Sequence, residues 1–512
     1  MKRDPKGIIY ASLDEIQADE AALSLIPKEL AQRLKVFPLS LKEGKLRLLC
    51  PRSHDLNLIN DLRFLSGKWI EIIPSEPFFV LSAIERFYSE TATQIETSPK
   101  EDLTFKSFIK NNGLEIKRLR QEVEKTPIVK LVNNLISRAI VMGASDIHLE
   151  PFDKEFKVRY RLDGMLTEME PITVEKKAAV VSRIKIMAEL DIAERRRPQD
   201  GRIRVEGENR VIDIRVSTLP TDFGEKVVLR ILDKTQLKLD LENLGFDQRS
   251  LHLFREKIKL PYGMILVTGP TGSGKTTTLY AALNHIKNPM INILTIEDPI
   301  EYTLEGINQS QVKSEISFTF ANALRSFLRQ DPNVIMVGEI RDYETVEIAI
   351  RASLTGHLVL STLHTNDAPT AVTRLLDMGA EPFLVSSSVT LVLAQRLVRK
   401  ICLKCREAYQ PSEFIVEKLC LSSEEIKDIV FYKGFGCPFC NQTGHAGRIA
   451  VFEIMPVTPK IAEMIDRKAN SSEIKKEARV EGMLTLREDA INKMKKGITT
   501  AEEVLRETSE IG

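Results

Sequence analysis

One short segment, residues 264–278, constrains the fold of this chain more than any other. Its sequence is MILVTGPTGSGKTTT, in which a β-branched and apolar run leads into a glycine-rich loop and then into helix-compatible residues. This order of strand, loop and helix is the context in which G-x-x-x-x-G-K-[ST] forms a phosphate-binding loop. A glycine-rich turn without a ligand is the alternative, but it leaves the Lys-Thr pair and the flanking elements unexplained.

The residue types in this loop fit a polyphosphate. Glycine lets backbone N–H groups turn inward around an anion, and the following helix directs its positive dipole end to the same place. Lys275 supplies a mobile charge for the β- and γ-phosphates, and the Thr276 hydroxyl suits Mg²⁺. The segment therefore predicts a site for a nucleoside triphosphate. The expected binding residues are Gly269, Pro270, Thr271, Gly272, Ser273, Gly274, Lys275, Thr276 and Thr277.

The residues around this loop alternate between strand-like and helical segments. Four apolar runs, ILVTG, INILTIED, NVIMVGE and HLVLSTLH, are each followed by helical or loop sequence. Such alternation predicts a parallel sheet that binds its ligands at the carboxyl ends of the strands.

Acidic residues end two of these expected strands. Asn333–Glu339 resembles a Walker B strand, with Gly338 where many phosphate-loop enzymes carry a Mg²⁺-binding Asp. Glu339 follows and is the best candidate for polarising the attacking water. The other strand end supplies Glu297, Asp298 and Glu301. A helix or turn cap is the alternative for the first two, but acids beside a phosphate loop favour a functional role.

Histidines flank one expected strand. His357 and His364 bracket an apolar run in a chain with seven histidines. A γ-phosphate sensor and a core or capping histidine remain equal alternatives on the residues alone.

An arginine that reaches the nucleotide as a cationic finger speeds phosphoryl transfer. The alternative for any single arginine is a position on a solvent-exposed strand face. Candidate fingers are Arg325, Arg329 and Arg341 near the loop, and Arg215 and Arg230 on earlier strands.

Four of the six cysteines form two Cys-x-x-Cys pairs, Cys402 with Cys405 and Cys437 with Cys440. In a cytosolic protein such pairs indicate structural zinc before a disulfide, because four thiolates close a tetrahedral shell. Four unligated thiols are the alternative. Cys50 and Cys420 lack such partners and are expected to be packing residues.

Length and composition limit the classes of protein to which this chain can belong. A chain of 512 residues with 43% hydrophobic content is expected to form three or four folded domains. The formal net charge of +1 argues against a polyanion-binding surface over the whole protein. No run approaches the roughly 18 apolar residues of a membrane span, and the N-terminus does not resemble a signal peptide. A cytosolic location is therefore expected, with at most a peripheral membrane role.

With these motifs assembled, the chain resembles the type II secretion and type IV pilus assembly ATPases from about Ile128 to its C-terminus. The resemblance rests on the phosphate loop, the two cysteine pairs and several further segments. These are SDIHLEP, RYRLDG, DIRVSTLPTDFGEKVVLRIL, TIEDPIEY, LRQDPNVIMVGEIRD and TGHLVLSTLHTNDA. The first hundred residues resemble the family's N-terminal module only loosely, and no Arg-Leu-Gly pattern for cyclic di-GMP is clear.

The resemblance implies a fold and a domain order. The expected fold class is multidomain α/β, with a RecA-like phosphate-loop ATPase core, a PAS-like α+β middle domain and a small α/β N-terminal module. The expected boundaries are 1–95 for the partner-binding module, 96–122 for a linker, 123–236 for the middle domain, 237–395 for the ATPase core, 396–455 for the tetracysteine zinc module and 456–512 for a helical domain.

The resemblance also implies an activity and partners. It indicates an ATP-hydrolysing homohexamer with Mg²⁺ and Zn²⁺, bound peripherally at the cytoplasmic face of the inner membrane. Its expected partners are a membrane platform protein and the cytoplasmic domain of a membrane-anchored component, with no nucleic acid. Alternatives are a pilus retraction motor or a RecA-like nucleic-acid translocase. By resemblance the catalytic residues are Glu339, the acids Glu297, Asp298 and Glu301, the histidines His357 and His364, and the middle-domain arginines Arg215 and Arg230.

Overall fold

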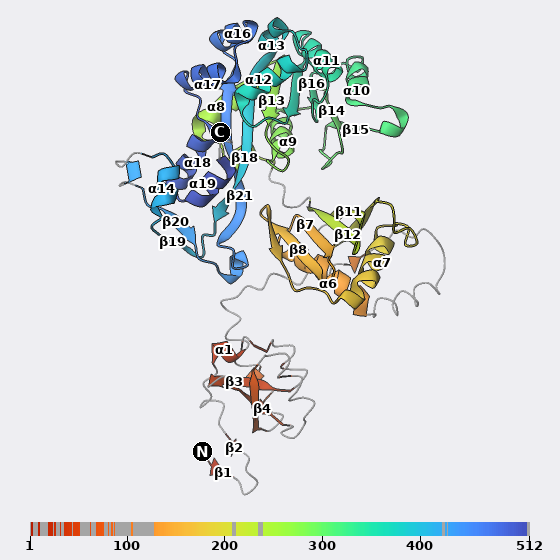
Figure 1. Ribbon diagram of the computed structural model, residues 1–512, viewed down its shortest axis with the longest axis vertical. Coiled ribbons are helices and arrows are strands. Elements are labelled where there is room, and N and C mark those ends of the chain that lie inside the picture. Colours follow the sequence, from red (N-terminus) through yellow and green to blue (C-terminus); the bar gives the residue numbers. More distant parts are fainter. Residues whose placement is uncertain are drawn as a thin grey trace. The chain divides into compact units, whose positions relative to one another are not determined.

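The computed structural model divides into two compact units, Met1–Glu101 and Asp102–Gly512 (Figure 1). It describes residues 127–206, 211–233, 239–421, 425–426 and 429–508, residues 104–105, and short segments between residues 2 and 87.

The first unit contains a three-stranded sheet in the order β3-β4-β5. β3 and β4 are antiparallel, whereas β4 and β5 are parallel. Leu46 and Leu48 alternate along β4 with more exposed residues and are fully buried, as a strand with one covered face requires. The elements are β1 (Lys2–Arg3), β2 (Ile9–Tyr10), α1 (Glu20–Leu23), β3 (Phe37–Lys42), β4 (Lys45–Cys50) and β5 (Trp69–Pro74).

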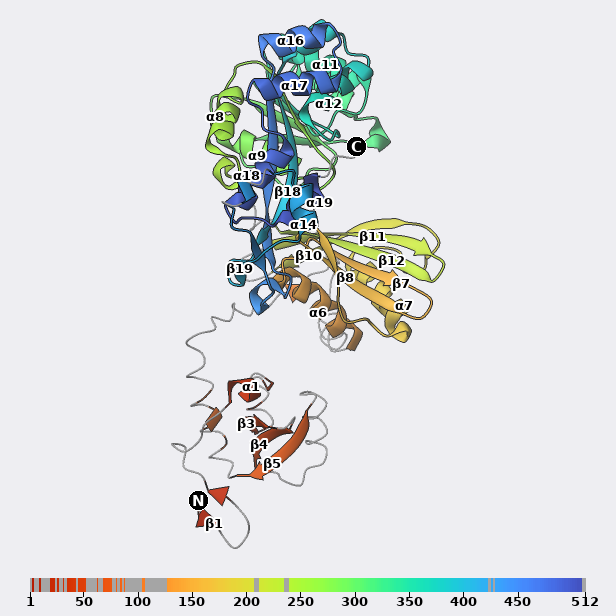
Figure 2. The ribbon, with the colours of Figure 1, turned by 60° about the vertical axis from the view of Figure 1, so that its left-hand side comes forward.

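The second unit begins with an antiparallel seven-stranded sheet in the order β6-β10-β11-β12-β7-β8-β9. Helices α6 and α7 lie together on one of its faces (Figure 2). The strands are β6 (Thr104–Phe105), β7 (Asp146–Pro151), β8 (Phe156–Leu162), β9 (Met165–Glu168), β10 (Gln199–Glu206), β11 (Val211–Thr221) and β12 (Gly224–Asp233). The helices are α6 (Pro127–Val141), the short 3₁₀ turn η3 (Val174–Lys176) and α7 (Lys177–Met187).

Alternation along these strands decides which side chains leave the core. Ile212, Ile214 and Val216 of β11 point into the core that β11 forms with α6 and α7. The residues between them therefore lie on the opposite face. On that face Arg215 stands directly across from Arg202 on one side and Arg230 on the other.

The segment expected as a linker, 96–122, mostly lies outside the described residues. Its described part is β6, which pairs with the edge of the middle sheet through Val205 and Glu206 of β10. Two residues of this segment therefore pair with a sheet, and the linker assignment stays a prediction.

A second seven-stranded sheet, in the order β15-β14-β16-β17-β13-β18-β21, follows the middle sheet. All neighbouring pairs are parallel except β18 with β21. The four expected runs form β13, β14, β16 and β17, so the expected α/β class with a parallel sheet is confirmed. The strands are β13 (Gly263–Thr268), β14 (Ile293–Glu297), β15 (Asn308–Gln311), β16 (Val334–Val337), β17 (Leu358–Leu363), β18 (Val389–Ile401) and β21 (His445–Pro456).

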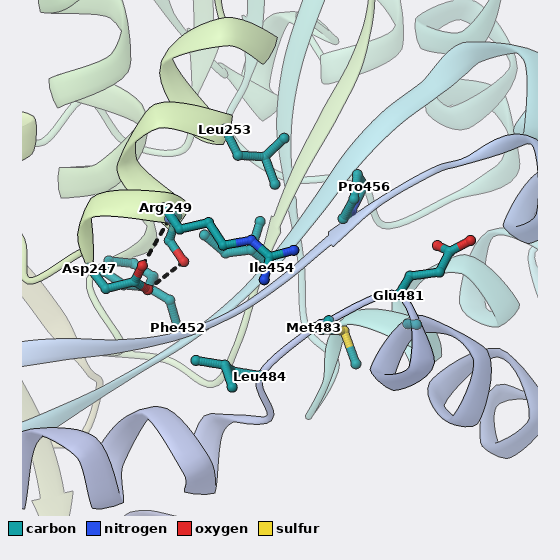
Figure 3. Close-up of a pocket in the computed structure, with 12 residues that line it drawn as sticks. Asp247, Arg249, Leu253, Phe452, Ile454, Pro456, Glu481, Met483 and Leu484 are labelled. Atoms are coloured by element: carbon teal, nitrogen blue, oxygen red, sulfur yellow. Dashed lines mark hydrogen bonds between the residues drawn. The ribbon is translucent and has the colours of Figure 1, made fainter.

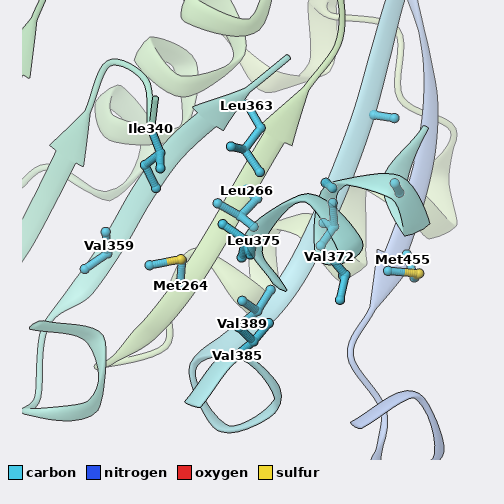
Figure 4. Packing of buried hydrophobic residues seen from close by; sticks show 14 of the residues in the cluster. Met264, Leu266, Ile340, Val359, Leu363, Val372, Leu375, Val385, Val389 and Met455 are labelled. Carbon is cyan, nitrogen blue, oxygen red and sulfur yellow. The ribbon is translucent and has the colours of Figure 1, made fainter. Parts of the chain in front are cut away.

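Helices cover both faces of this sheet, so its central strands β13, β16 and β17 are buried along their whole length. Met264 and Leu266 of β13 point to the core under α10–α13 (Figure 4), and Ile265 and Val267 point to the core under α8 and α9. The first group comprises η6 (Ser314–Ile316), α10 (Phe320–Phe327), α11 (Tyr343–Leu354), α12 (Ala368–Asp377) and α13 (Pro382–Ser388). The second comprises η5 (Leu241–Asn243), α8 (Gln248–Lys257) and α9 (Lys275–Ile286).

The expected boundary between residues 395 and 396 falls inside β18, because this strand and β21 extend from the ATPase sheet into the cysteine region. The other boundaries stay predictions. The remaining elements are β19 (Arg406–Ala408), α14 (Glu413–Lys418), β20 (Tyr432–Gly434), η7 (Pro438–Cys440), α16 (Pro459–Asp466), α17 (Ser471–Val480), α18 (Leu486–Lys495) and α19 (Ala501–Thr508). Among the described residues, no helix has the length and apolar character needed to cross a bilayer.

Candidate functional site

The phosphate loop joins the carboxyl end of β13 to the start of α9. Gly269 and Gly274 have φ angles of +147° and +88°, which side chains with a Cβ rarely adopt. A Cβ on Gly269 would also lie 2.4 Å from the Gln395 carbonyl oxygen. The backbone path therefore requires glycine, and it brings the loop amides to the N-terminus of α9.

Two polar groups in the loop fit an anion. Lys275 Nζ donates to the Gly269 carbonyl at 2.8 Å, and burial lowers the pKa of this amine to about 8. Ser273 Oγ is buried, and no hydrogen-bond partner is present for it among the described residues. A buried cation and an unpaired hydroxyl are both satisfied by phosphate oxygens, so the loop fits a nucleoside triphosphate.

A cleft of about 960 Å³ opens over this loop. Its walls come from four main sources: the loop itself, the carboxyl ends of β14, β16 and β17, the exposed face of the middle sheet, and residues of β18, β21 and α19. Of the expected site residues, the lining includes Pro270 to Thr277 together with Glu297, Asp298, Glu301, Glu339, Arg341, His364 and Arg230.

Glu339 lies among cations at the end of β16. Its carboxylate forms an ion pair with Arg341 and lies 3.4 Å from His364 Nε2. Arg341 also lies 3.9 Å from Asp298, so the ends of β14 and β16 share this arginine. Burial and the neighbouring Lys275 lower the pKa of His364, which keeps the imidazole neutral near pH 7. Glu339 is thus an accessible carboxylate, 15% exposed, that faces the loop.

Glu297 has a different environment from Glu339. It is 3% exposed and accepts hydrogen bonds from three neutral donors. These are Tyr280 Oη, Thr295 Oγ1 at 2.6 Å and Gln309 Nε2 at 3.0 Å. Because its oxygens are occupied by α9, β14 and β15, Glu297 holds the phosphate-loop helix against the sheet. This geometry favours a positioning role for Glu297, and its expected catalytic role stays a prediction.

The two middle-sheet arginines are placed differently. Arg230 lines the cleft, with its Nε 3.1 Å from Asp146. Arg215 forms an ion pair with Glu301 at 3.0 Å and donates to the Ile300 carbonyl. Arg215 therefore contacts the segment after β14 but is not among the described residues that line the cleft, whereas Arg230 lines the cleft.

Three other expected candidates lie apart from the cleft lining that the structure describes. His357 precedes β17, and its Nδ1 lies 2.9 Å from the Ala352 carbonyl, whereas His364 follows the same strand at the opposite edge of the sheet. Arg325 pairs with Glu344, and Arg329 donates to the Arg325 carbonyl. A strand separates His357 from the phosphate loop, and its imidazole lies against the last turn of α11; its expected role at the nucleotide stays a prediction.

Sequence reasoning missed Arg161 of β8, which lines the cleft, and three cleft arginines from the C-terminal part of the chain, Arg396, Arg448 and Arg506. The last three come from β18, β21 and α19, which return to the phosphate loop from the cysteine region and the C-terminus. Only the pairing of β18 beside β13 brings them there. No local motif marks them, so sequence alone carries no signal for this wall.

The four expected metal ligands form one cluster. The sulfurs of Cys402, Cys405, Cys437 and Cys440 all lie within 4.8 Å of one another, and three sulfur–sulfur distances are 3.6, 3.8 and 3.9 Å. A tetrahedron of thiolates about 2.3 Å from zinc has sulfurs about 3.8 Å apart. Backbone N–H groups of Cys437 and Gly444 also donate to Cys440 Sγ. The cluster fits a structural zinc ion.

A smaller cavity of about 140 Å³ opens between α8, β21 and the segment that joins α17 to α18 (Figure 3). Leu253, Ile454 and Met483 line it, and the Arg249 side chain extends toward Ile454. It contains no phosphate-loop residue, so the larger cleft is the candidate nucleotide site.

Two family models match this chain. Residues 121–506 match a family model described as type II/IV secretion system protein, and residues 7–94 match the MshEN domain. The N-terminal match is firmer than the loose resemblance expected from the sequence.

Individual relatives match over most of the chain. The type IV pilus assembly ATPase PilB of Myxococcus xanthus is 44% identical, over 98% of this chain and 89% of the relative. The type II secretion system protein E of Pseudomonas aeruginosa is 44% identical, over 98% of this chain and 100% of the relative. The solved structure of the pilus retraction motor PilT with bound ADP is similar at a TM-score of 0.50 and 27% identity, covering 74% of this chain and 97% of that chain. The chain therefore belongs to the type II/IV secretion system protein family, and it is an ATPase.

Proposed function

We propose that this chain is the subunit of a homohexameric motor that couples ATP hydrolysis to assembly of a type II secretion pseudopilus or a type IV pilus. Support comes from full-length relatives that carry the names of a pilus assembly ATPase and a type II secretion protein. The domain division and the roles of the site residues are part of this proposal.

One observation carries the proposal: a single cleft joins the phosphate loop, Glu339 and Arg230 of the middle sheet. A phosphate-binding loop alone would serve many functions. A second domain that contributes an arginine to the same cleft allows nucleotide chemistry to change with the position of that domain. This is the coupling that a mechanical ATPase needs.

The cleft residues divide the chemistry between them. Loop amides and Lys275 bind and orient the triphosphate, and Glu339 accepts a proton from the attacking water. Arg230 stabilises charge that develops on the transferred phosphoryl group. Arg215 and Glu301 hold the middle sheet beside the β14 strand end. Glu297 fixes the helix that carries Lys275.

Two metal ions complete the proposal. Mg²⁺ would be held by Thr276 and would supply positive charge against the phosphates, and Asp298 lines the same cleft. Zn²⁺ would be held by the four clustered cysteines and would fix the fold of their module.

The proposed location is the cytoplasmic side of the inner membrane, where such a motor meets its partners. The proposed partners are a platform protein and the cytoplasmic domain of a membrane-anchored component. A retraction motor remains the second candidate, because the PilT structure shares the fold. A nucleic-acid translocase finds less support, since the chain has one tryptophan and a net charge of +1.

Two variants test the site. Lys275→Ala is expected to lose ATP binding, whereas Glu339→Gln is expected to bind ATP with wild-type affinity and to lose at least about 100-fold in turnover. Equilibrium binding of a fluorescent ATP analogue and phosphate release separate the two effects. Wild-type turnover in Glu339→Gln contradicts its role. Arg325→Ala, which alters an arginine paired away from the cleft, serves as the matched control.

A further inference from the structure

Strand β18 carries an amide side chain in a buried apolar segment. Residues 391–394 are Leu, Val, Leu and Ala and are all buried, and the next residue, Gln395, is 2% exposed. Burying an amide costs free energy unless new hydrogen bonds replace those that it makes to water. An apolar side chain of the same size would fill this space without that cost, so packing alone does not explain a glutamine here.

Both ends of the Gln395 amide bond to the phosphate-loop region. Its Nε2 donates to the Ser273 carbonyl at 2.8 Å, and its Oε1 accepts from the Thr278 hydroxyl at 2.7 Å. A carbonyl oxygen can only accept, so the contact with Ser273 fixes which end of the amide is the nitrogen. Thr278 lies in the first turn of α9. Gln395 therefore ties the loop to the helix that follows it.

The bond to Ser273 also sets the direction of the next backbone amide. The peptide bond between Ser273 and Gly274 is trans, so its C=O and N–H point in opposite directions. Ser273 and Gly274 line the nucleotide cleft, whereas Gln395 is not among the described residues that line it. Because Gln395 holds the Ser273 carbonyl on the side away from the cleft, the Gly274 N–H is directed toward the cleft.

The backbone at Gly274 benefits from such support. Its φ of +88° is a conformation in which glycine has many alternatives when nothing holds it. A Cβ on Gly274 would lie 2.8 Å from Gln395 Nε2, so the two residues are in direct contact. An amide that already points at the ligand position avoids the free-energy cost of ordering it on binding. The Gln395 contacts therefore favour phosphate binding before a ligand arrives.

We propose that Gln395 is a positioning residue for ATP, which directs the Gly274 N–H toward the phosphates by holding the Ser273 carbonyl. Its role rests on the nucleotide site of the proposed function and adds to that site a residue from outside the phosphate-loop motif. Gln395 acts through the loop and touches no phosphate itself. Ground state and transition state lose the same amide contact without it, so KM changes and kcat does not.

Steady-state ATP hydrolysis by the full-length protein tests the proposal. Gln395→Met keeps the length of the side chain and removes both hydrogen bonds. It is expected to raise KM for ATP about tenfold with unchanged kcat, the effect of losing one oriented donor to a charged group. Equilibrium binding of ADP is expected to weaken by the same factor, because ADP retains the phosphates that loop amides contact.

A second variant covers the case in which Gln395→Met does not fold. Gln395→Glu keeps the size of the side chain and its acceptor for the Thr278 hydroxyl, but an ionised carboxylate has no N–H for the Ser273 carbonyl. It is also expected to raise KM at unchanged kcat. Thermal melting of each variant shows whether it is folded at the assay temperature.

The matched control is Thr390→Val. Thr390 lies on the same strand and donates to the Met264 carbonyl at 3.2 Å, near the end of β13 opposite the phosphate loop. This variant is expected to keep the wild-type KM. An unchanged KM in both Gln395 variants overturns the proposal, as does an equal rise in Thr390→Val. A fall in kcat at wild-type KM also overturns it, because that is the effect of a smaller folded fraction. These results leave the proposed function intact, whereas failure of the wild type to bind ATP overturns both.

Discussion

Two carboxylates at strand ends, Glu339 and Glu297, differ in their hydrogen-bond and ion-pair partners, and these partners determine the chemical role open to each. Glu339 faces Arg341, His364 and Lys275 across an open cleft, whereas Glu297 is buried among Tyr280, Thr295 and Gln309. Sequence identified both acids because both end an apolar run. It could not separate their roles, since the donors to Glu297 come from α9 and β15, which pack on β14 only in the folded chain.

The buried amine of Lys275 predicts a pH dependence of ATP binding. Its pKa is lowered to about 8 by burial, and the triphosphate binds the protonated form. Below this pH the free protein is already charged, so affinity is constant; above it, the amine must take up a proton on binding. The Kd for ATP is therefore expected to rise about tenfold for each pH unit above pH 8.

Isothermal titration at several pH values measures this effect. Lys275→Arg is the control, because a guanidinium stays charged throughout the range. If that variant binds, its affinity is expected to be independent of pH. An unchanged wild-type Kd up to about pH 10 contradicts the assignment of the shift to Lys275.

The Glu297 network predicts a stability effect without a loss of chemistry. Tyr280→Phe removes one of three donors to a buried carboxylate and is expected to destabilise the protein by about 1–3 kcal/mol. Chemical denaturation followed by fluorescence measures the change. Tyr262→Phe is the control, since this tyrosine is 58% exposed and a neutral result is expected there. Equal stability of the two variants argues against the network.

At the scale of elements, periodicity predicted the strands that carry the site. β13, β14, β16 and β17 are short apolar runs, and their burial on both faces makes them easy to recognise. β18 was not predicted, because Val389–Ile401 is long enough for a helix and ends in basic residues. Its neighbours β13 and β21 are distant in sequence, so only tertiary pairing identifies it.

The two histidines also show that a local sequence pattern cannot predict tertiary position. His357 and His364 bracket one strand, and the sequence pattern gives no reason to treat them differently. His357 lies at the amino end of β17 and His364 at its carboxyl end. The phosphate loop follows the carboxyl end of the parallel strand β13, so only His364 lies near it. The cysteine pairs were fully predictable, because Cys-x-x-Cys spacing is a local property.

The cysteine cluster predicts a zinc-dependent local fold. Cys437→Ser removes one of four ligands and is expected to release zinc and to unfold the turns around it, because structural zinc supplies free energy on the order of 10 kcal/mol to small modules. Metal content by atomic absorption and protease sensitivity of residues 400–450 report the change. Cys420→Ser, outside the cluster, is the control. An unchanged melting profile and a metal-free wild type contradict the zinc assignment.

At the scale of the whole molecule, the nucleotide cleft depends on the contact between the middle sheet and the ATPase sheet. The middle sheet leaves an arginine-bearing face uncovered by its own helices, and Arg230 on that face lines the cleft of the ATPase sheet. Local patterns predicted each sheet separately. The contact between the sheets depends on surface side chains such as Arg215 and Glu301, whose positions no hydrophobic periodicity predicts. From the sequence alone, Arg215 and Arg230 could equally have lain on a solvent-exposed strand face.

Turnover of Arg230→Ala at saturating ATP tests most directly whether the middle sheet takes part in cleaving the nucleotide. Arg204→Ala is the matched control, because Arg204 lies on β10 of the same sheet and pairs with Asp213, outside the described cleft lining. The expected result is a loss of about 10³-fold in turnover for Arg230→Ala with unchanged ATP affinity, and wild-type turnover for the control. Wild-type turnover in Arg230→Ala, or an equal loss in both variants, contradicts the account.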